Sequence, residues 1–137
     1  MRKLFLCLAF GIVLVTVPTA VAASPTIRLA LIHAVSGCHV WATSDSRPFG
    51  PTHTVVLKHG GKIEIRVSCP MAFNVTQLAG PKIALGVSPW QTGTTHTLVF
   101  KKRGLYRLMA MNVQSSAEMG LQTLGADNMP VLTVRVG

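Results

Sequence analysis

The sequence predicts an all-β, Greek-key β-sandwich of seven to eight short strands. Apolar and polar residues alternate with a period of two in several runs, and clusters of Gly, Pro and Ser separate these runs. A helical period of 3.6 residues is nearly absent. Hydrophobic residues make up 49% and charged residues 12% of the 137 residues, which excludes a disordered chain or a coiled coil.

The first 23 residues have the features of a secretory signal peptide. Two positive charges stand at Arg2 and Lys3, an apolar run covers 4–17, and small residues at 20–23 suit a cleavage site. The apolar run is shorter than the ~20 residues of a membrane helix, so we expect no transmembrane segment once the peptide is removed. We therefore expect a secreted or periplasmic protein with a signal peptide over 1–23 and one domain over 24–137.

The clearest strand candidate is 62–68, in which Ile63, Ile65 and Val67 share one face. Glycines in 59–61 supply a turn before it, so we expect 52–58 to be its hairpin partner. A short helical turn is predicted at 115–119 from its capping-box spacing. In chain order, the other candidate runs, from which we expect seven or eight strands in all, cover 26–35, 38–42, 72–78, 82–85, 95–101, 105–111 and 131–136.

Two cysteines remain after removal of the signal peptide, and we expect them to form a disulfide bond. Cys38 and Cys69 would be exported to a compartment that permits disulfides. Cys69 continues the inward set of Val67, and Cys38 has the same parity as Val40, so both sulfur atoms are expected to point inward. The bridge would close a loop of about 31 residues and stabilise the fold by roughly 3–4 kcal/mol.

The composition argues against catalysis. Only four Asp and Glu residues are present, which leaves few candidates for paired-carboxylate chemistry. The five histidines lack metalloenzyme spacing, and the 86–90 segment is not a nucleophile elbow because Trp90 replaces its second glycine. A secreted enzyme with an unrecognised site is the weakest of our three hypotheses.

The chain is strongly basic, with a net charge of +9. Removing Arg2 and Lys3 leaves 11 basic against 4 acidic residues, or +7. One cluster, Lys101 to Arg103, stands at the tip of a predicted hairpin and is able to contact anionic polymers through charge alone. We interpret it as a solvated turn. We expect no specific nucleic-acid partner because the few aromatic residues give no stacking platform.

The 100–108 segment resembles the cupredoxin hairpin F-x-x-P-G-x-Y-x-F, in which Gly104 and Tyr106 are the most telling matches. The G-C-H-V-W stretch at 37–41 and the T-L-G-A-D-N stretch at 123–128 further resemble a group of small secreted bacterial cupredoxin-like proteins. The resemblance covers nearly all of 24–137. It implies the Greek-key sandwich of the blue-copper proteins.

The same resemblance implies that the type-1 copper site is dismantled. Cupredoxins bind copper with a histidine, a cysteine, a second histidine and a methionine. In this sequence the first histidine position falls on Phe73 and the cysteine position on Ala110, and no histidine follows His96. Only the methionine position has a candidate, Met119. Since Phe and Ala donate nothing to a metal, we do not expect an ordinary type-1 site.

Our leading hypothesis is a metal-free, non-enzymatic binding or structural module of the envelope or extracellular space. Its partner is unknown, no cofactor is expected, and Trp41, Phe73, Trp90 and the methionine loop would give an apolar surface where copper would otherwise lie.

The alternative is a copper-handling protein that holds Cu(I) with soft thioethers and an imidazole. Cysteine ligation by Cys38 or Cys69 is a further option, in competition with the disulfide. Met109 and Met111 alternate along one strand, so packing against the core explains their spacing equally well, and we favour that explanation. The candidate Cu(I) ligands are Met119, Met109, Met111, Met71 and His39.

Overall fold

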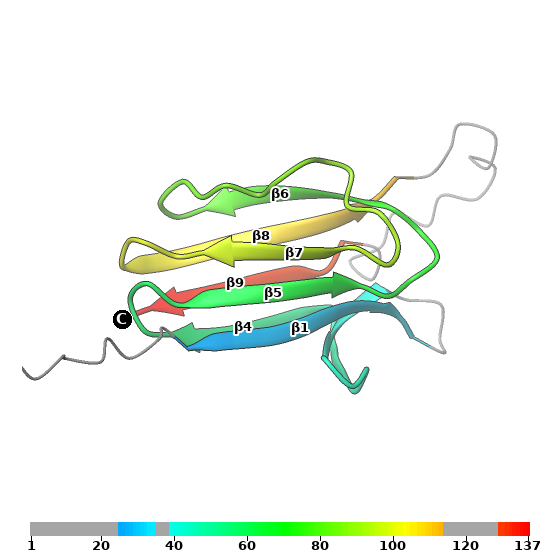
Figure 1. Ribbon diagram of the computed structural model, residues 1–137, viewed down its shortest axis with the longest axis horizontal. Helices are drawn as coiled ribbons and strands as arrows, with labels where there is room; N and C mark the ends of the chain where they lie inside the picture. Colours follow the sequence, from blue (N-terminus) through cyan, green and yellow to red (C-terminus); the bar gives the residue numbers. More distant parts are fainter. Residues whose placement is uncertain (1–24, 35–38, 114–128) are drawn as a thin grey trace, which may run out of the picture.

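The computed structural model describes residues 25–34, 39–113 and 129–137, which form nine strands in two facing sheets (Figure 1). The described residues contain no helix. The predicted signal peptide and the predicted helical turn at 115–119 lie outside the described residues. The strands are β1 (Thr26–His33), β2 (His39–Thr43), β3 (Pro48–Gly50), β4 (Thr52–Leu57), β5 (Lys62–Val67), β6 (Phe73–Ala79), β7 (Thr95–Val99), β8 (Gly104–Asn112) and β9 (Val131–Val136).

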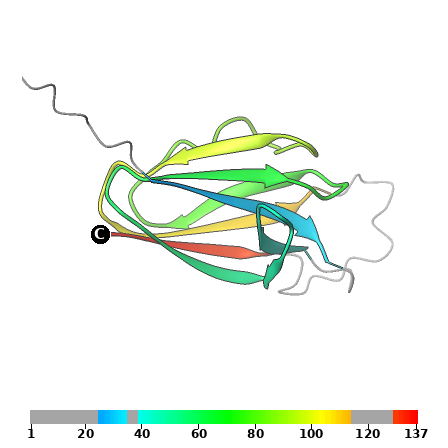
Figure 2. The ribbon, with the colours of Figure 1, turned by 60° about the horizontal axis from the view of Figure 1, so that its bottom comes forward.

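One sheet has the strand order β3-β2-β1-β5-β7 and the other the order β4-β9-β8-β6 (Figure 2). Two pairs, β1 with β5 and β4 with β9, are parallel, and the other pairs are antiparallel. From β4 to β8 each strand lies in the other sheet from its predecessor. The chain therefore crosses repeatedly between the layers, and the predicted all-β Greek-key sandwich is confirmed.

The predicted hairpin between 52–58 and 62–68 is wrong. β4 and β5 form where expected, but β4 pairs with β9 in one sheet and β5 pairs with β1 and β7 in the other. Gly60 has φ 75° and turns the chain, as its lack of a Cβ allows. Alternation shows which face of a strand is buried but not which strand pairs with it, so the turn joins two sheets.

Two further differences concern short segments. Residues 82–85 were predicted as a strand but lie outside regular secondary structure. Pro48–Gly50 forms the short strand β3, which pairs with β2 through an irregular register and was not predicted. Three residues are too few to show an alternating pattern.

The core lies between the sheets and follows the period of two. On β5, Ile63, Ile65 and Val67 are all fully buried, as the sequence predicts. Tyr106 on β8 is also fully buried, and its hydroxyl donates a hydrogen bond to the Lys102 carbonyl at 2.6 Å. The largest fully buried side chains are Trp41, Trp90, Tyr106, Phe73 and Phe100.

Strand β2 is buried on both faces. Trp41 pairs with Leu31, and both belong to the core cluster. Val40 pairs with Ile32 and is not part of that cluster, although it is only 5% exposed. The assumption that Val40 marks the inward face of this strand is therefore wrong, because successive residues of a strand point to opposite faces.

Candidate functional site

The two positions at which the resemblance to cupredoxins predicts lost copper ligands lie together in the core. Phe73 on β6 pairs with Asn112 on β8, and Ala110 lies two residues from Asn112 on the same strand. Phe73 and Ala110 are therefore diagonal neighbours on one face of the sheet. Both side chains point into the core and have a solvent exposure of 0%. Neither side chain has a donor atom, so these two positions do not fit copper.

The predicted apolar surface built from Trp41, Phe73 and Trp90 is wrong, since none of the three is more than 1% exposed. The backbones of Phe73 and Trp90 exchange hydrogen bonds of 2.9 and 2.7 Å. The Trp90 indole nitrogen donates to the Leu85 carbonyl at 3.0 Å. His96 stacks on Trp90 with ring centroids 4.2 Å apart, and burial lowers the pKa of His96. Trp90 therefore contacts both β6, through Phe73, and β7, through His96, which are edge strands of the two sheets.

The methionines of the described residues lie on both sides of the four-stranded sheet. Met109 and Met111 alternate with the buried Ala110 and lie on the outer face of β8, where Met111 is 42% exposed. The interpretation that they pack against the core is therefore wrong. Met71 does pack against the core, and its sulfur accepts a hydrogen bond from Asn112 Nδ2 at 2.9 Å. Met119 lies outside the described residues.

A pair of histidines meets where β1 ends and β2 begins. His33 and His39 are directly opposite each other in the antiparallel pair of strands. His33 Nδ1 lies 3.5 Å from His39 Nε2, and the ring centroids are 5.1 Å apart. His39 is 3% exposed and contacts the Phe73 ring edge to face at 5.2 Å, whereas His33 is exposed.

Of these two histidines, only His39 was predicted from the sequence as a metal ligand. The sequence does contain an indication of the pair, because one histidine lies near the end of a predicted strand and the other near the start of the next strand along the chain. Among the described residues there is no group of three or more His, Cys, Asp or Glu side chains placed to hold a metal ion.

The predicted disulfide has only one described partner. Cys69 is a free thiol in the structure, is 1% exposed and belongs to the core cluster. Burial raises the pKa of this thiol. Cys38 lies outside the described residues, next to His39, and β1 separates β2 from β5 in the sheet. The bridge stays a prediction, and its argument from the parity of Val40 no longer supports it.

Positive charge collects at the end of the sandwich opposite His39. The connections β4–β5, β6–β7 and β7–β8 reach this end, where hydrogen bonds link the first of them to the third. Gly60 N donates to Phe100 O at 3.0 Å, and Phe100 N donates to Gly61 O at 3.1 Å. Pro81 lies against Gly104. All five lysines of the described residues belong to this end, and with Arg103 they form what we call the basic end: Lys58, Lys62, Lys82, Lys101, Lys102 and Arg103.

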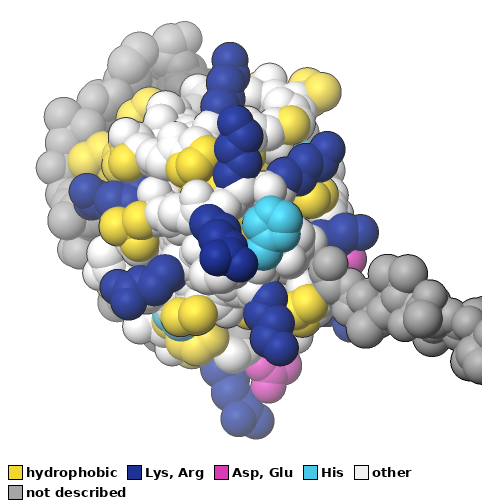
Figure 3. All heavy atoms as spheres, turned by 90° about the vertical axis from the view of Figure 1, so that its left-hand side faces the viewer, with side chains coloured by type: hydrophobic (Ala, Val, Ile, Leu, Met, Phe, Trp, Pro, Cys, Tyr) yellow, Lys and Arg dark blue, Asp and Glu magenta, His cyan; other side chains and the backbone are white. Residues whose placement is uncertain are grey.

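The basic end is exposed and carries little opposite charge (Figure 3). The two ion pairs of the described residues use other cations: Arg28 pairs with Glu64 at 2.9 Å and Arg47 with Asp45 at 3.0 Å. Three of the lysines border an open groove of about 380 Å³ along β7. The groove is lined by Lys82, Lys101, Lys102, Ile83, Ala84, Thr97, Val99 and Tyr106.

No protein-family model and no curated protein sequence matches the chain. Solved structures similar to it include a purple cupredoxin from Nitrosopumilus maritimus, with 14% identity, a TM-score of 0.45 and coverage of 79% of this chain and 98% of that chain. A mutant amicyanin in its reduced Cu(I) form has 17% identity and a TM-score of 0.44, covering 85% and 87%. A cysteine protease inhibitor from Entamoeba histolytica has 12% identity and a TM-score of 0.45, covering 82% and 97%. The proteins differ in function, so this similarity concerns the fold alone.

Within the described part of the chain, no helix is long and apolar enough to span a membrane.

Proposed function

We propose that the protein is an exported, non-enzymatic binding module that binds anionic polymers of the envelope or extracellular space through its basic end. The observation that carries this proposal is the collection of six cations at one end of the sandwich, five from three connections of the chain and one, Lys62, from the first residue of β5. Export rests on the predicted signal peptide.

The connections that carry the cations of the basic end contact one another. Two of the connections that carry them, β4–β5 and β7–β8, are joined by backbone hydrogen bonds, such as that from Gly60 N to Phe100 O at 3.0 Å. At physiological ionic strength, charges interact over about 8 Å, so neighbouring lysines reinforce one another's attraction for an anion. A polymer with regularly spaced anionic groups would meet several of them at once and release its condensed counterions.

The kind of cation favours a partner recognised by charge and not by shape. Five of the six are lysines, each with a compact point charge on a flexible stem, whereas arginine has a planar fork that selects bidentate carboxylate or phosphate geometry. The lysines that border the groove are therefore suited to phosphate, sulfate or carboxylate groups alike.

A matched pair of charge variants tests the proposal with inorganic polyphosphate as the probe. Lys101→Gln/Lys102→Gln removes two cations of the basic end, and Arg47→Gln/Arg66→Gln removes two exposed cations elsewhere. We expect the first variant to lose roughly tenfold or more in affinity at low salt, with a shallower dependence of log K on log salt. The second variant should lose only about twofold.

Equal losses in the two variants would mean that the polymer responds to net charge alone, and the proposal would be wrong. An absence of polyphosphate binding at low salt would contradict it equally.

Copper handling is the second candidate function. It is favoured by the position of His39 and Met71, which both lie near the buried end at Phe73. Met109 and Met111 point to the outer face of their sheet, so such a site would depend on Met71, Met119 and His39. Titration with Cu(I) in the presence of a competing chelator tests it. Binding tighter than about 1 µM that is lost in Met119→Leu would favour copper handling.

A further inference from the structure

We propose that His33 and His39 form a binding site for a divalent transition-metal ion of the Zn²⁺ or Cu²⁺ kind. The site uses neither the basic end nor the positions at which cupredoxins hold copper. It is therefore independent of polymer binding at the basic end, although it shares His39 with the second candidate function.

The strand register brings the two imidazoles together. β1 and β2 are antiparallel, and His33 is directly opposite His39 in their ladder. Two residues away on each strand, the next inward-facing pair is Leu31 and Trp41, and both side chains are fully buried. The histidines therefore continue the inward row at the point where the core opens to solvent.

The distance between the two nitrogens suits a shared metal ion better than a direct hydrogen bond. His33 Nδ1 and His39 Nε2 are 3.5 Å apart. A good hydrogen bond from a nitrogen donor spans about 2.7–3.2 Å, so this contact is long for one. Two imidazole nitrogens that each bind zinc at about 2.0–2.1 Å and are 3.5 Å apart subtend an angle of roughly 115–120° at the metal, close to the tetrahedral value.

The two histidines differ in exposure, and each would contribute differently to a binding site. His39 is 3% exposed and packs against the edge of the buried Phe73 ring, so its imidazole is fixed in place. His33 is exposed and gives the ion a path from solvent. Among the described residues these two histidines are the ligands, and water would fill the remaining coordination positions that they leave open.

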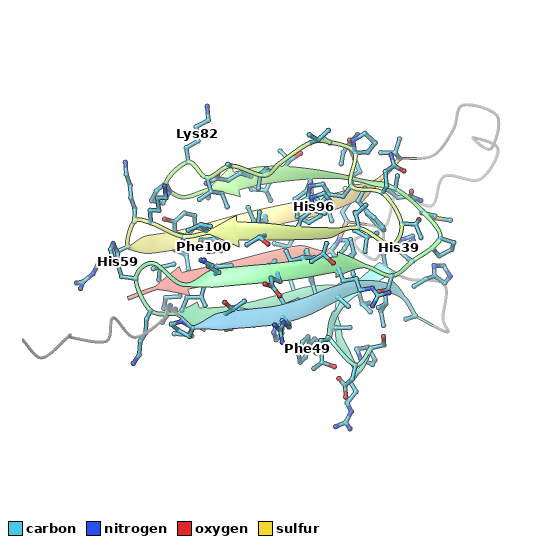
Figure 4. The ribbon with its side chains drawn as sticks, in the orientation of Figure 1. His39, Phe49, His59, Lys82, His96 and Phe100 are labelled. Atoms are coloured by element: carbon cyan, nitrogen blue, oxygen red, sulfur yellow. The ribbon has the colours of Figure 1, made fainter. Side chains whose placement is uncertain are left out.

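The lysines of the basic end lie far from the two histidines. Figure 4 shows His39 at the opposite end of the sandwich from His59 and Lys82. The five described lysines are all at that far end, beyond the distance over which charges act strongly in salt. Imidazole ligands suit Zn²⁺, Cu²⁺ and Ni²⁺, and the general order of affinities predicts that Cu²⁺ binds more tightly than Zn²⁺.

Calorimetric titration of the purified protein with Zn²⁺ tests the site. Because His39 is buried and its replacement risks unfolding, the variant is His33→Gln, and the control is His59→Gln, which removes an exposed histidine from the basic end. We expect one equivalent of Zn²⁺ to bind, an affinity at least roughly tenfold weaker in His33→Gln, and a change below about twofold in His59→Gln.

A second measurement locates the ion, because the two cysteines are also potential zinc ligands. Substoichiometric Cu²⁺ should broaden the imidazole NMR signals of His33 and His39 before those of His53, His59 and His96. The proposal is overturned if His33→Gln binds Zn²⁺ as tightly as the unchanged protein, if both variants weaken binding equally, or if the broadening begins at another histidine.

Discussion

The side chains at positions 73 and 110 determine whether a metal ligand is present at the end of the sandwich near His39. Phe73 and Ala110 are diagonal neighbours on β6 and β8, and both are inaccessible to solvent. An imidazole and a thiolate at these places would be metal ligands in a cupredoxin, whereas a phenyl ring and a methyl group supply only packing. The two side chains are therefore part of the hydrophobic core.

If Phe73 serves the core, its removal should cost stability. We expect Phe73→Ala to lower the free energy of unfolding by about 3–5 kcal/mol, because it leaves a cavity among fully buried neighbours. The control is Phe49→Ala, since Phe49 is 44% exposed and stacks on His53 at the surface, and it should cost under about 1.5 kcal/mol. Urea denaturation measures both, and similar losses would contradict the assignment of Phe73 to the core.

His96 links stability to pH. Burial lowers the pKa of His96 below its ordinary value of 6.5, so the unfolded chain takes up a proton more readily than the folded protein. The resulting contribution to stability is complete above the unfolded pKa and is lost as the pH falls through 6.5 towards the folded pKa.

We therefore expect the free energy of unfolding to fall between about pH 7.5 and pH 5.5, and to fall less in His96→Phe. Phenylalanine keeps an aromatic ring for stacking on Trp90 but does not titrate. Part of the slope should remain in the variant, because burial also lowers the pKa of His53. Denaturation at several pH values checks this, and an unchanged slope in His96→Phe would contradict it.

At the scale of the strands, alternation predicted positions well and partners poorly. The predicted strand at 62–68 matches β5 and its buried face, because one face of an antiparallel or mixed sheet packs on the core. The hairpin to 52–58 failed because a tight glycine turn is compatible with both a hairpin and a crossing between sheets. The predicted hairpin tip at Lys101–Arg103 likewise joins β7 of one sheet to β8 of the other.

The alternation of residues did not predict the inward face of β2, because this strand is buried on both faces. β2 has four consecutive buried residues, so its hydrophobicity does not show which face meets the core. For the same reason the sequence did not single out the inward pair of His33 and His39. The pairing of β1 with β2 was needed to bring the two side chains together.

Gly80 tests how closely the end of β6 approaches β8. It has φ 99°, and a Cβ there would lie 2.5 Å from the Leu105 carbonyl oxygen and 2.9 Å from the Tyr106 Cα. Gly93 has φ 80° but open space around it, which makes it a matched control for the backbone conformation alone.

We expect Gly80→Ala to lower the free energy of unfolding by about 2–4 kcal/mol and Gly93→Ala by about 1 kcal/mol. The difference arises because backbone atoms cannot move aside as a flexible side chain does. Thermal or urea denaturation of both variants measures it. A cost for Gly80→Ala no greater than that for Gly93→Ala would show that the two segments are less tightly packed than described.

At the scale of the whole molecule, the two ends of the sandwich differ in chemistry. One end carries the exposed lysines, and the other carries aromatic residues and the paired histidines. The sequence placed positive charge only at Lys101 to Arg103. The remaining cations join them because connections from both sheets reach the same end, which depends on strand order and is not visible in any local pattern.

An NMR titration of the labelled protein with polyphosphate tests the central claim most directly, because it compares the two ends in one experiment. We expect the backbone amide signals of 58–62, 82 and 101–103 to shift in a saturable manner, and the shifts to diminish as salt is added. The signals of 31–33 and 39–41 should stay in place. Shifts centred on the histidine end, or spread evenly over both ends, would contradict the account.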